Sequence, residues 1–508
     1  MPAVAQDVRA RFAPEGASGT SAKTQVIAPN FMVSAANPHA VDAGVAILKA
    51  GGSAVDAAIA TQLVLNLVEP QSSGIGGGAF IVLFDAAENK VRTYDGRETA
   101  PAAAQPDRFL RDDGRMSFRT VVNSGLSVGV PGLVRVMELA HQRHGLLPWA
   151  RLFEPAIRLS SEGFRVSPRL NLLLNWYGAK RFVPKARAYF FDPSGQPRPV
   201  GYLLKNVEFA DTLKRIAEGG SAAFYEDGPI ARSIIAALQS APNAKGDMTL
   251  QDIADYRALE REPVCFKYRV RRICGMGPPS SGGITVAQTL NLLEGYDLSK
   301  QAIGVMSPKA LHLIAEAQKL AYADRNRYLA DADFVKPPEG LLAPDYIAKR
   351  RRLISDGEAM MRPQAGQPQA LAHRRFGADE TFERSGTSHI SIVDKRGQAV
   401  AMTTTIEGGF GSGLWASGFL LNNELTDFSF LPVDAQGRPI ANRVEGGKRP
   451  RSSMSPTLVF GQDGKLEAAV GSVGGSRIIL YVIKSLIALT DWGMSAQAAA
   501  DLSNFGSR

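Results

Sequence analysis

A threonine that follows a glycine and opens an alternating apolar stretch is the most informative feature of this sequence. Thr387 stands directly after Gly386, and the stretch from Thr387 to Asp394 has the alternation of a strand. If the Gly386–Thr387 peptide bond breaks, the hydroxyl and the freed α-amine of Thr387 lie on one residue. That arrangement pairs a nucleophile with a base. We therefore predict that cleavage of the chain unmasks Thr387 as a nucleophile.

A second threonine is placed to assist the first. Residues 388–394 predict one strand and residues 399–406 predict its returning partner. Such a hairpin can bring Thr405 beside Thr387, where its hydroxyl could orient the new α-amine. The alternative is an ordinary strand threonine, because threonine favours sheets.

Two groups of glycines suggest different roles. The backbone N–H groups of Gly474 and Gly475 suit a developing oxyanion, because glycine lets the chain approach a substrate closely. The glycine-rich residues 74–78 come before a strand, whereas a dinucleotide site needs strand, glycines and helix in that order. We predict close backbone packing at 74–78, and no cofactor.

Composition favours one large domain. The chain has 508 residues, of which 45% are hydrophobic and 21% charged, with a net charge of +9.

The basic runs at 349–352 and 373–375 raise the question of whether the protein binds nucleic acid. No aromatic residues alternate with these charges, as a groove for a single strand requires. We interpret them as a solvated helix end and loop, and we predict no nucleic-acid partner.

Few features of the sequence bear on the cellular compartment of the protein. Cys265 and Cys274 flank the expected strand at 266–270 and could be a free thiol pair or one disulfide. The first 23 residues lack the apolar region of a signal peptide, and the longest apolar runs are interrupted, so we predict no membrane span. A cytoplasmic location is the default, or a periplasmic or secreted one if a leader has been removed.

Local patterns predict a layered α/β sandwich, with residues 1–25 disordered. Apolar periodicity, caps and turn residues define the elements. The expected helices are 37–50, 53–68, 134–143, 149–161, 251–256, 284–294, 308–329 and 478–489, and the expected strands are 79–85, 90–97, 266–270, 269–274, 388–394, 399–406, 457–460 and 466–470.

Six stretches together resemble the γ-glutamyltransferase (glutathione hydrolase) family of N-terminal-nucleophile hydrolases. The resemblance spans about residue 30 to the end. It implies a four-layer αββα sandwich and autocleavage into two associated chains, residues 1–386 and 387–508. The stretches are 95–98, 278–283, 387–394, 420–424, 448–457 and 471–477.

The resemblance also implies a reaction. Thr387 Oγ would attack a γ-glutamyl amide, as in glutathione, and form a γ-glutamyl ester. Water or the amine of an amino acid or peptide would then take the acyl group. Thr405, Gly474 and Gly475 would assist this chemistry, and neither a cofactor nor a metal is implied.

The substrate pocket follows from the same resemblance. Arg97 would pair the α-carboxylate of the glutamyl group, with Ser452 and Ser453 contacting the same group. Glu424 and Asp427 would surround the α-ammonium. Without the resemblance, a surface arginine and turn serines are the more ordinary interpretations.

Glu407 is a departure, because many family members carry asparagine there. Glu407, Glu424 and Asp427 would place three carboxylates near one substrate cation. Like charges raise one another's pKa, so one of them could be protonated when the site is empty.

The segment between Asp427 and Ser452, where the family has a lid, contains no tyrosine. This absence favours hydrolysis over transfer, because water can enter the site more easily. The chain also ends earlier than relatives usually do.

Other functions were weighed. A cephalosporin (glutaryl) acylase-like amidase would share Thr387 and the glycine pair but not the acyl pocket, and an unprocessed homologue could be an inactive binding protein. No nucleophile elbow occurs around Ser281 or Ser472. His141 and His144 lie three residues apart on an expected helix but lack a clear third metal ligand.

Overall fold

The computed structural model describes residues 23–508 except 113, 300, 369–375, 382 and 385. Residues 1–22, which make up most of the segment predicted to be disordered (1–25), therefore lie outside the described residues. Residues 355–385, a polar stretch that ends just before Thr387, are likewise described only in part.

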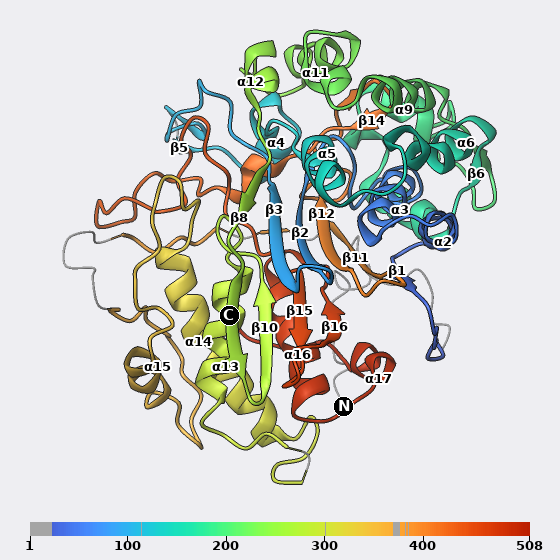
Figure 1. The fold of residues 1–508 in the computed structure, drawn as a ribbon. Coiled ribbons are helices and arrows are strands. Elements are labelled where there is room, and N and C mark those ends of the chain that lie inside the picture. The colour runs from blue at the N-terminus through green and yellow to red at the C-terminus, as the bar shows by residue number, and fades with distance from the viewer. Residues whose placement is uncertain (1–22, 113, 300, 369–375, 382, 385) are drawn as a thin grey trace, which may run out of the picture.

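Two antiparallel sheets form the centre of the molecule (Figure 1). The first has six strands in the order β1 (Met32–Ser34), β11 (Thr387–Val393), β12 (Ala399–Thr405), β2 (Gly78–Asp85), β3 (Lys90–Gly96) and β8 (Leu259–Arg261). The second has four strands in the order β16 (Leu466–Val470), β15 (Thr457–Phe460), β10 (Arg271–Gly275) and β9 (Val264–Tyr268).

Strand β2 shows how the layers are arranged. Its alternate residues Phe80, Val82 and Phe84 pack with β15 of the second sheet, where the rings of Phe84 and Phe460 lie 5.0 Å apart between centroids. Its other residues face the helical core on the opposite side. Because successive side chains of a strand point to opposite faces, a strand that is apolar on both faces must lie between two layers.

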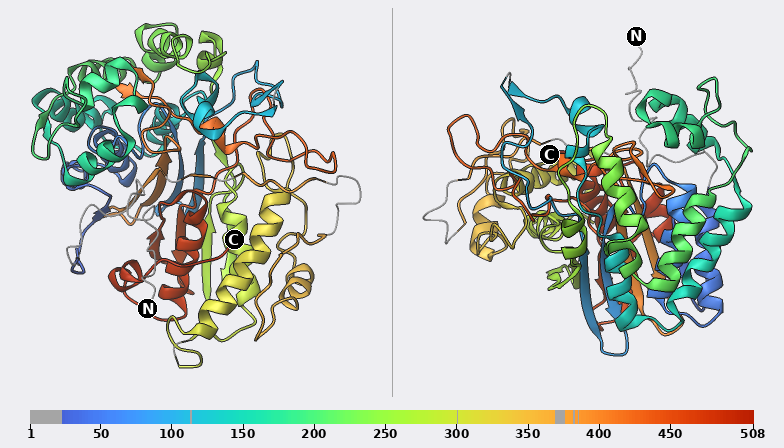
Figure 2. Two further views of the ribbon diagram at one scale, coloured as in Figure 1. Left: turned by 180° about the vertical axis from the view of Figure 1, so that it is seen from behind. Right: turned by 90° about the horizontal axis from the view of Figure 1, so that it is seen from above.

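Helices complete the four layers. The first sheet is covered by α2 (Pro38–Lys49), α3 (Ala54–Val68) and α5 (Leu133–His144), and the second by α13 (Gly282–Leu293), α14 (Pro308–Tyr328) and α16 (Ile478–Thr490). In Figure 2, viewed from above, the blue and green helices lie on one side of the first sheet and the yellow ones on the other. The αββα sandwich is thus confirmed.

The remaining elements surround this sandwich. They are β4 (Leu110–Arg111), β5 (Gly114–Arg115), α4 (Phe118–Val122), η1 (Gly125–Ser127), η2 (Trp149–Phe153), α6 (Glu154–Glu162), β6 (Phe164–Arg165), α7 (Pro168–Tyr177), η3 (Ala179–Arg181), α8 (Pro184–Phe190), β7 (Leu203–Leu204), α9 (Val207–Gly219), α10 (Ala222–Tyr225), α11 (Pro229–Gln239), α12 (Leu250–Asp255), α15 (Pro344–Arg351), β13 (Trp415–Ala416), β14 (Phe419–Leu420), η4 (Glu424–Asp427), η5 (Gly475–Arg477) and α17 (Ala496–Asp501).

Local signals account for most of these boundaries. Ser53 and Asp56 form the predicted capping box, and every residue of α3 is buried. The helix expected at 149–161 is instead a 3-10 turn followed by α6, which begins with Pro155 in its first turn. The overlapping strands expected at 266–270 and 269–274 separate into β9 and β10, because Arg269 has a φ of 54° and turns the chain.

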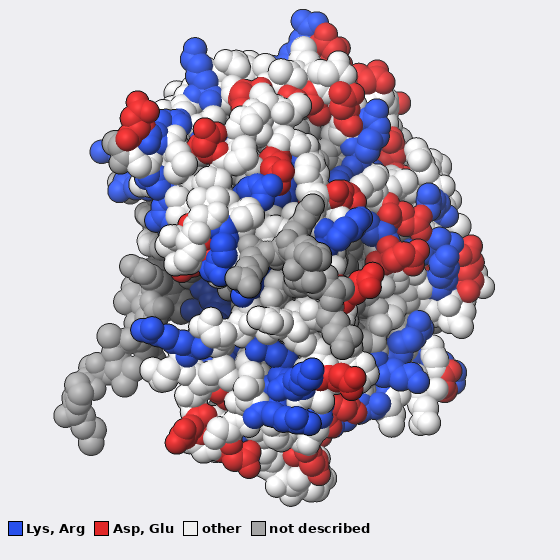
Figure 3. Space-filling view, turned by 90° about the vertical axis from the view of Figure 1, so that its left-hand side faces the viewer, with Lys and Arg blue, Asp and Glu red and all other residues white. Residues whose placement is uncertain are grey.

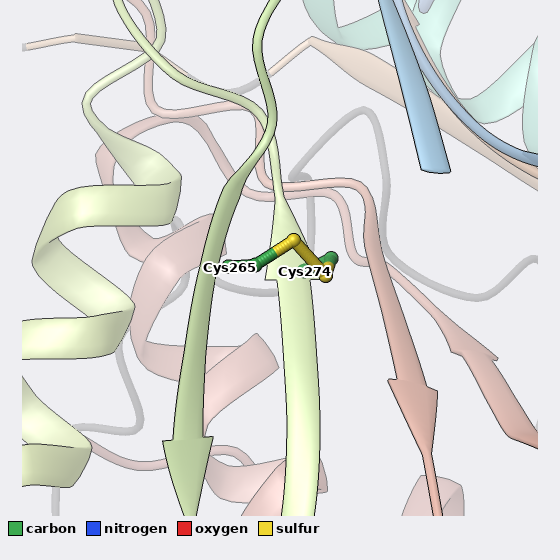
Figure 4. The surroundings of a disulfide bond; sticks show 2 residues. All are labelled: Cys265 and Cys274. Carbon is green, nitrogen blue, oxygen red and sulfur yellow. A yellow bond between two sulfur atoms is a disulfide. The ribbon is translucent and has the colours of Figure 1, made fainter. Parts of the chain in front are cut away.

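The two cysteines form a disulfide. Cys265 of β9 and Cys274 of β10 are direct partners in the sheet, and their sulfur atoms are 2.06 Å apart (Figure 4). This settles the alternative that the sequence leaves open.

The basic run at 349–352 is only partly solvated, so its interpretation as a solvated helix end is partly wrong. Arg350 is buried and pairs with Asp324 at 3.3 Å, and Arg351 Nε donates to Leu292 O at 2.9 Å, at the end of α13. On the face shown in Figure 3, basic and acidic side chains are interspersed. None of the helices in the described ranges is long and apolar enough to cross a membrane.

Candidate active site

The two predicted threonines face each other across two strands. Thr387 is the first residue of β11, Thr405 is the last of β12, and they are direct partners in the sheet. Thr405 Oγ1 donates to the carbonyl oxygen of Gly386 at 2.7 Å and accepts from the N–H of Glu407 at 2.7 Å. In this continuous chain, the hydroxyl therefore contacts the carbonyl of the Gly386–Thr387 bond rather than an amine.

Close backbone packing holds the end of β12 in place. β12 lies between β11 and β2, beside the blue β2–β3 hairpin in Figure 1. A Cβ on Gly77 would overlap the carbonyl oxygen of Thr405, and one on Gly76 would overlap that of Leu420. The predicted role of the 74–78 glycines is therefore confirmed, and it bears directly on the position of Thr405.

The second glycine pair approaches the same point. Gly474 and Gly475 have φ values of 137° and 56°, in the region that favours glycine, at the turn between β16 and α16. A Cβ on Gly475 would overlap the backbone oxygen of Arg384. Gly475 and Thr387 line one small cavity of about 20 Å³, which has room for about one water molecule. The backbone of Arg384 therefore occupies the space over this glycine.

Arg97 is fully buried next to this cavity. Its guanidinium donates to the carboxylates of Glu424 and Asp427, the latter at 2.7 Å, and its Nε donates to Pro450 O at 3.1 Å. Burial opposes its charge, but Glu424, Asp427 and Glu98 together raise its pKa. Arg97 is thus paired here with carboxylates of the protein, where the resemblance assigns it a carboxylate of the substrate.

Carboxyl groups around Arg97 hold their protons strongly. Burial raises the pKa of Glu424 and of Asp427 well above the ordinary values, although Arg97 opposes the shift. Burial likewise raises the pKa of Glu98 to about 7. The charge of Glu407 raises the pKa of both Glu424 and Asp427 further, in the direction predicted for crowded carboxylates.

Glu407 belongs to this group. It has a φ of 70°, which non-glycine residues adopt rarely. Its side chain accepts from Asn423 Nδ2 and, at 3.2 Å, from the N–H of Arg384. Burial raises the pKa of Glu407 as well. Glu407 therefore lines the cavity and bridges Asn423 and the backbone of Arg384.

The two serines differ in what they contact. Ser453 Oγ donates to the carboxylate of Glu383 and accepts from Arg325 Nη2 at 2.6 Å. Ser452 Oγ accepts from the N–H of Met454 at 3.1 Å within its own turn. Both line the cavity that contains Thr387, so all the predicted site residues lie around it except Gly474, which is adjacent.

Sequence reasoning missed Arg325, Glu383 and Asn423. Asn423 stands within the stretch 420–424 that carries the resemblance, so it could have been found. Arg325 lies on an ordinary long helix and Glu383 in a polar segment, and no spacing pattern links either residue to Thr387.

Other candidate residues have different contacts. His141 Nε2 lies 2.9 Å from Leu147 O, and His144 Nε2 lies 2.7 Å from the hydroxyl of Tyr94. In the described ranges no three His, Cys, Asp or Glu side chains gather as a metal site. Ser127, within a Gly-x-Ser-x-Gly stretch, is buried and donates to Ser124 O at 2.9 Å, so it is not an exposed nucleophile.

Comparison with known proteins agrees with this geometry. The model of the family described as gamma-glutamyltranspeptidase matches residues 40–508. The glutathione hydrolase proenzyme of Bacillus subtilis (strain 168) is 37% identical over 479 residues, which are 92% of this chain and 79% of that protein. The chain belongs to the γ-glutamyltranspeptidase family. A second relative, the glutathione hydrolase proenzyme of Escherichia coli (strain K12), is 38% identical to this family member over 489 residues, 94% of the chain and 81% of that protein.

Solved structures of the same fold include more than one activity. A cephalosporin acylase from Bacillus halodurans matches this γ-glutamyltranspeptidase family member with a TM-score of 0.81 and 26% identity, over 95% of this chain and 84% of that one. Helicobacter pylori gamma-glutamyltranspeptidase matches with a TM-score of 0.63 and 32% identity, over 70% of this chain and 99% of that one. The resemblance drawn from the sequence is therefore confirmed, and the family fold is that of the N-terminal-nucleophile hydrolases.

Proposed function

We propose that the chain is a γ-glutamyltransferase and glutathione hydrolase that cleaves itself between Gly386 and Thr387. The observation that carries the proposal is the pairing of Thr387 with Thr405, whose hydroxyl donates to the carbonyl oxygen of Gly386. This pairing lies against a buried pocket of guanidinium and carboxyl groups. Glutathione hydrolase relatives at 37% and 38% identity support the assignment.

Self-cleavage follows from this contact. Thr387 Oγ attacks the carbonyl carbon of Gly386, and the hydroxyl of Thr405 stabilises the charge that develops on the carbonyl oxygen. The C–N bond breaks as the nitrogen takes up the proton that Oγ gives up, which leaves Gly386 as an ester on Thr387 Oγ. Water hydrolyses that ester to a carboxylate on Gly386, and the α-amine of Thr387 is free. The two pieces, residues 1–386 and 387–508, stay associated.

Turnover then uses the new N-terminus. The α-amine takes the hydroxyl proton of Thr387 as Oγ attacks a γ-glutamyl amide, and it later delivers the proton to the leaving amine. The backbone N–H groups of Gly474 and Gly475 bind the oxyanion. Water or an amine acceptor releases the acyl group from the ester. Glutathione or another γ-glutamyl compound is the donor.

Recognition of the donor requires both charges at its α-carbon to be bound. Glu407, Glu424 and Asp427 bind the α-ammonium, and Arg97 with the two serines binds the α-carboxylate. In the unbroken chain the guanidinium of Arg97 contacts the carboxyl groups of Glu424 and Asp427. A bound ammonium would share those carboxylates, which frees guanidinium donors for the substrate.

A cephalosporin (glutaryl) acylase-like amidase is the second candidate, favoured by the match to a solved cephalosporin acylase. A glutaryl group has a terminal carboxylate but no ammonium. Glu407, Glu424 and Asp427 would then have no substrate cation to bind, so the pocket supports a γ-glutamyl donor better.

The deciding experiment combines a gel with an assay. Purified protein should run as two bands, and Thr387→Ala protein as one. With γ-glutamyl-p-nitroanilide or glutathione, with and without glycylglycine, only the cleaved protein should release product. One band from an active wild-type protein, or activity that survives Thr387→Ala, would refute the proposal. Cleaved protein that prefers glutaryl-p-nitroanilide would favour the amidase.

The disulfide is informative about the cellular compartment of the protein. Disulfides persist mainly in oxidising compartments, so Cys265–Cys274 supports a periplasmic or secreted protein over the cytoplasmic default. Thiol titration of denatured protein from its native compartment should find no free thiol before reduction and two afterwards.

A further inference from the structure

Glu383, four residues before Thr387, contacts a buried cationic pair. Its carboxylate accepts from Ser453 Oγ and from Arg325 Nη2, and it lies 3.7 Å from Arg451 Nε. Glu383, Arg325 and Ser453 expose 4%, 2% and 3% of their surface. A carboxylate so deeply buried is stable only because these partners satisfy it.

Arg325 is held in place by residues other than Glu383. On α14, its Nε donates to Ser281 Oγ at 2.8 Å, its Nη1 to Asn326 Oδ1 at 2.9 Å, and its Nη2 to Ser453 Oγ at 2.6 Å. The guanidinium would therefore keep its orientation if Glu383 were removed.

This carboxylate occupies part of the proposed active site. Glu383 lines the same small cavity as Thr387, Glu407 and Gly475. The next residue, Arg384, lies with its backbone oxygen against Gly475 and donates its N–H to Glu407. Glu383 and Arg384 thus lie against both the proposed oxyanion glycine and the proposed acyl pocket.

Cleavage after Gly386 would turn these residues into a free chain end. If that end withdraws, Arg451 keeps a carboxylate partner, because Asp379 lies 2.9 Å from its Nη2. Arg325 instead loses the anion it pairs with. A buried guanidinium without an anion is unfavourable, so the vacated position has the charge and the donors to bind a carboxylate.

We propose that Glu383 holds, in the unbroken chain, the place of the donor's α-carboxylate, and that Arg325 together with Ser453 binds that carboxylate after cleavage. The inference rests on the proposed function and extends it: Arg325 is a specificity-determining residue in addition to Arg97. Glu383 also keeps donors out of the site until the chain is cut.

The first test compares three p-nitroanilides in wild-type, Arg325→Gln and Arg325→Lys enzymes. The γ-glutamyl group carries both charges, the glutaryl group only the carboxylate, and the 4-aminobutyryl group only the ammonium. Arg325→Gln should lower kcat/KM for the first two by about 10-fold to 100-fold, the range for a hydrogen bond to a charged group. The third should change by less than about 2-fold, and Arg325→Lys should restore part of the loss.

An equal loss for all three compounds would mean that Arg325 acts only through the fold, and would overturn the proposal. Compounds that turn over too slowly are compared as competitive inhibitors of γ-glutamyl-p-nitroanilide, with the same expected ranking.

The second test does not depend on activity. In the uncleaved Thr387→Ala chain, Glu383→Gly removes a side chain equivalent to propionate. Added propionate should raise the Tm of this double variant in a saturable way, and should not do so with the matched Glu380→Gly variant, whose side chain is exposed. A folded Glu383→Gly variant whose Tm ignores propionate would overturn the proposal. If the double variant fails to fold, the proposal is tested by the relative kcat/KM losses of the three p-nitroanilides in Arg325→Gln.

The two tests separate the proposals. A propionate response without Thr387-dependent cleavage of any anilide would leave the anion subsite standing and refute the proposed function. If the anilides are cleaved in a Thr387-dependent way but Arg325→Gln causes no loss specific to the carboxylate-bearing compounds, the proposed function stands and the role of Arg325 is refuted.

Discussion

At the scale of single residues, Thr405 links the sheet to the chemistry. Its hydroxyl bonds both to the Gly386 carbonyl and to the Glu407 amide. One side chain therefore contacts both the Gly386–Thr387 peptide bond and the turn that carries Glu407.

Replacing Thr405 by valine should slow self-cleavage by about 10²-fold or more, because one oxyanion donor is typically worth 10²–10³ in rate. Thr405→Ser keeps the donor and should process nearly normally. Densitometry of the uncut chain over time after purification measures both rates. If the valine variant matched the wild type, Thr405 would have no part in breaking the bond.

Glu407 makes a second prediction, on pH dependence. Its charge raises the pKa of Glu424 and of Asp427, so Glu407→Asn lowers both. Because a substrate ammonium needs ionised carboxylates, the acidic limb of the kcat/KM profile should move to lower pH.

The profile is measured with γ-glutamyl-p-nitroanilide between pH 5 and pH 9, with the exposed Glu380→Gln variant as control. An acidic limb that stays in place would argue that Glu407 does not sense the ammonium site.

At the scale of elements, the end of β12 depends on the neighbouring glycine-rich loop at 74–78. Ala at position 77 would put a methyl group on the Thr405 carbonyl oxygen. Gly77→Ala should therefore displace β12 and reduce self-cleavage, with a stability loss of about 1–3 kcal/mol, as for overpacked positions.

Gly275 of β10 is a matched buried control, since a Cβ there would meet its nearest neighbours at 3.5 Å. Gly275→Ala should process normally. Gel densitometry and urea unfolding together test the pair, and equal behaviour would remove Gly77 from the support of the site.

Prediction from sequence works where the signal is local. The capping box at Ser53 and the hairpin that pairs Thr387 with Thr405 follow from neighbours in the chain. Strand β1 has three residues, too few to show a period. The contact of Arg325 with Glu383 joins residues 58 positions apart, and only the packing of α14 against the site reveals it. The resemblance located Arg97, but not its pairing with Glu424 and Asp427.

At the scale of the whole molecule, buried carboxyl groups make stability depend on pH. Burial raises the pKa of Glu98 to about 7 in the folded chain, against an ordinary value of 4.5. The folded state therefore binds a proton that the unfolded state has already lost in this range. The stability contributed by Glu98 is fully present below about pH 4.5 and is lost as the pH rises through 7.

Glu98→Gln should remove this dependence. The fall in unfolding free energy of the uncut Thr387→Ala chain between pH 5 and pH 7 should shrink by about 2 kcal/mol, at about 1.4 kcal/mol per pKa unit. Urea unfolding at the two pH values measures it, with exposed Glu358→Gln as control. An unchanged difference would show that Glu98 is ionised in the folded chain.

The order of the strands has a consequence for how the protein folds and is processed. A break before Thr387 would leave β1, β2, β3 and β8 on one piece and β11 and β12 on the other, interleaved in one sheet, and the second sheet would likewise draw two strands from each. Neither piece alone could satisfy its strand edges, which invite aggregation when bare. If the chain is cut as proposed, folding would have to precede the cut and the process would be one-way: after denaturation, uncut Thr387→Ala protein should refold, whereas a two-piece protein should precipitate.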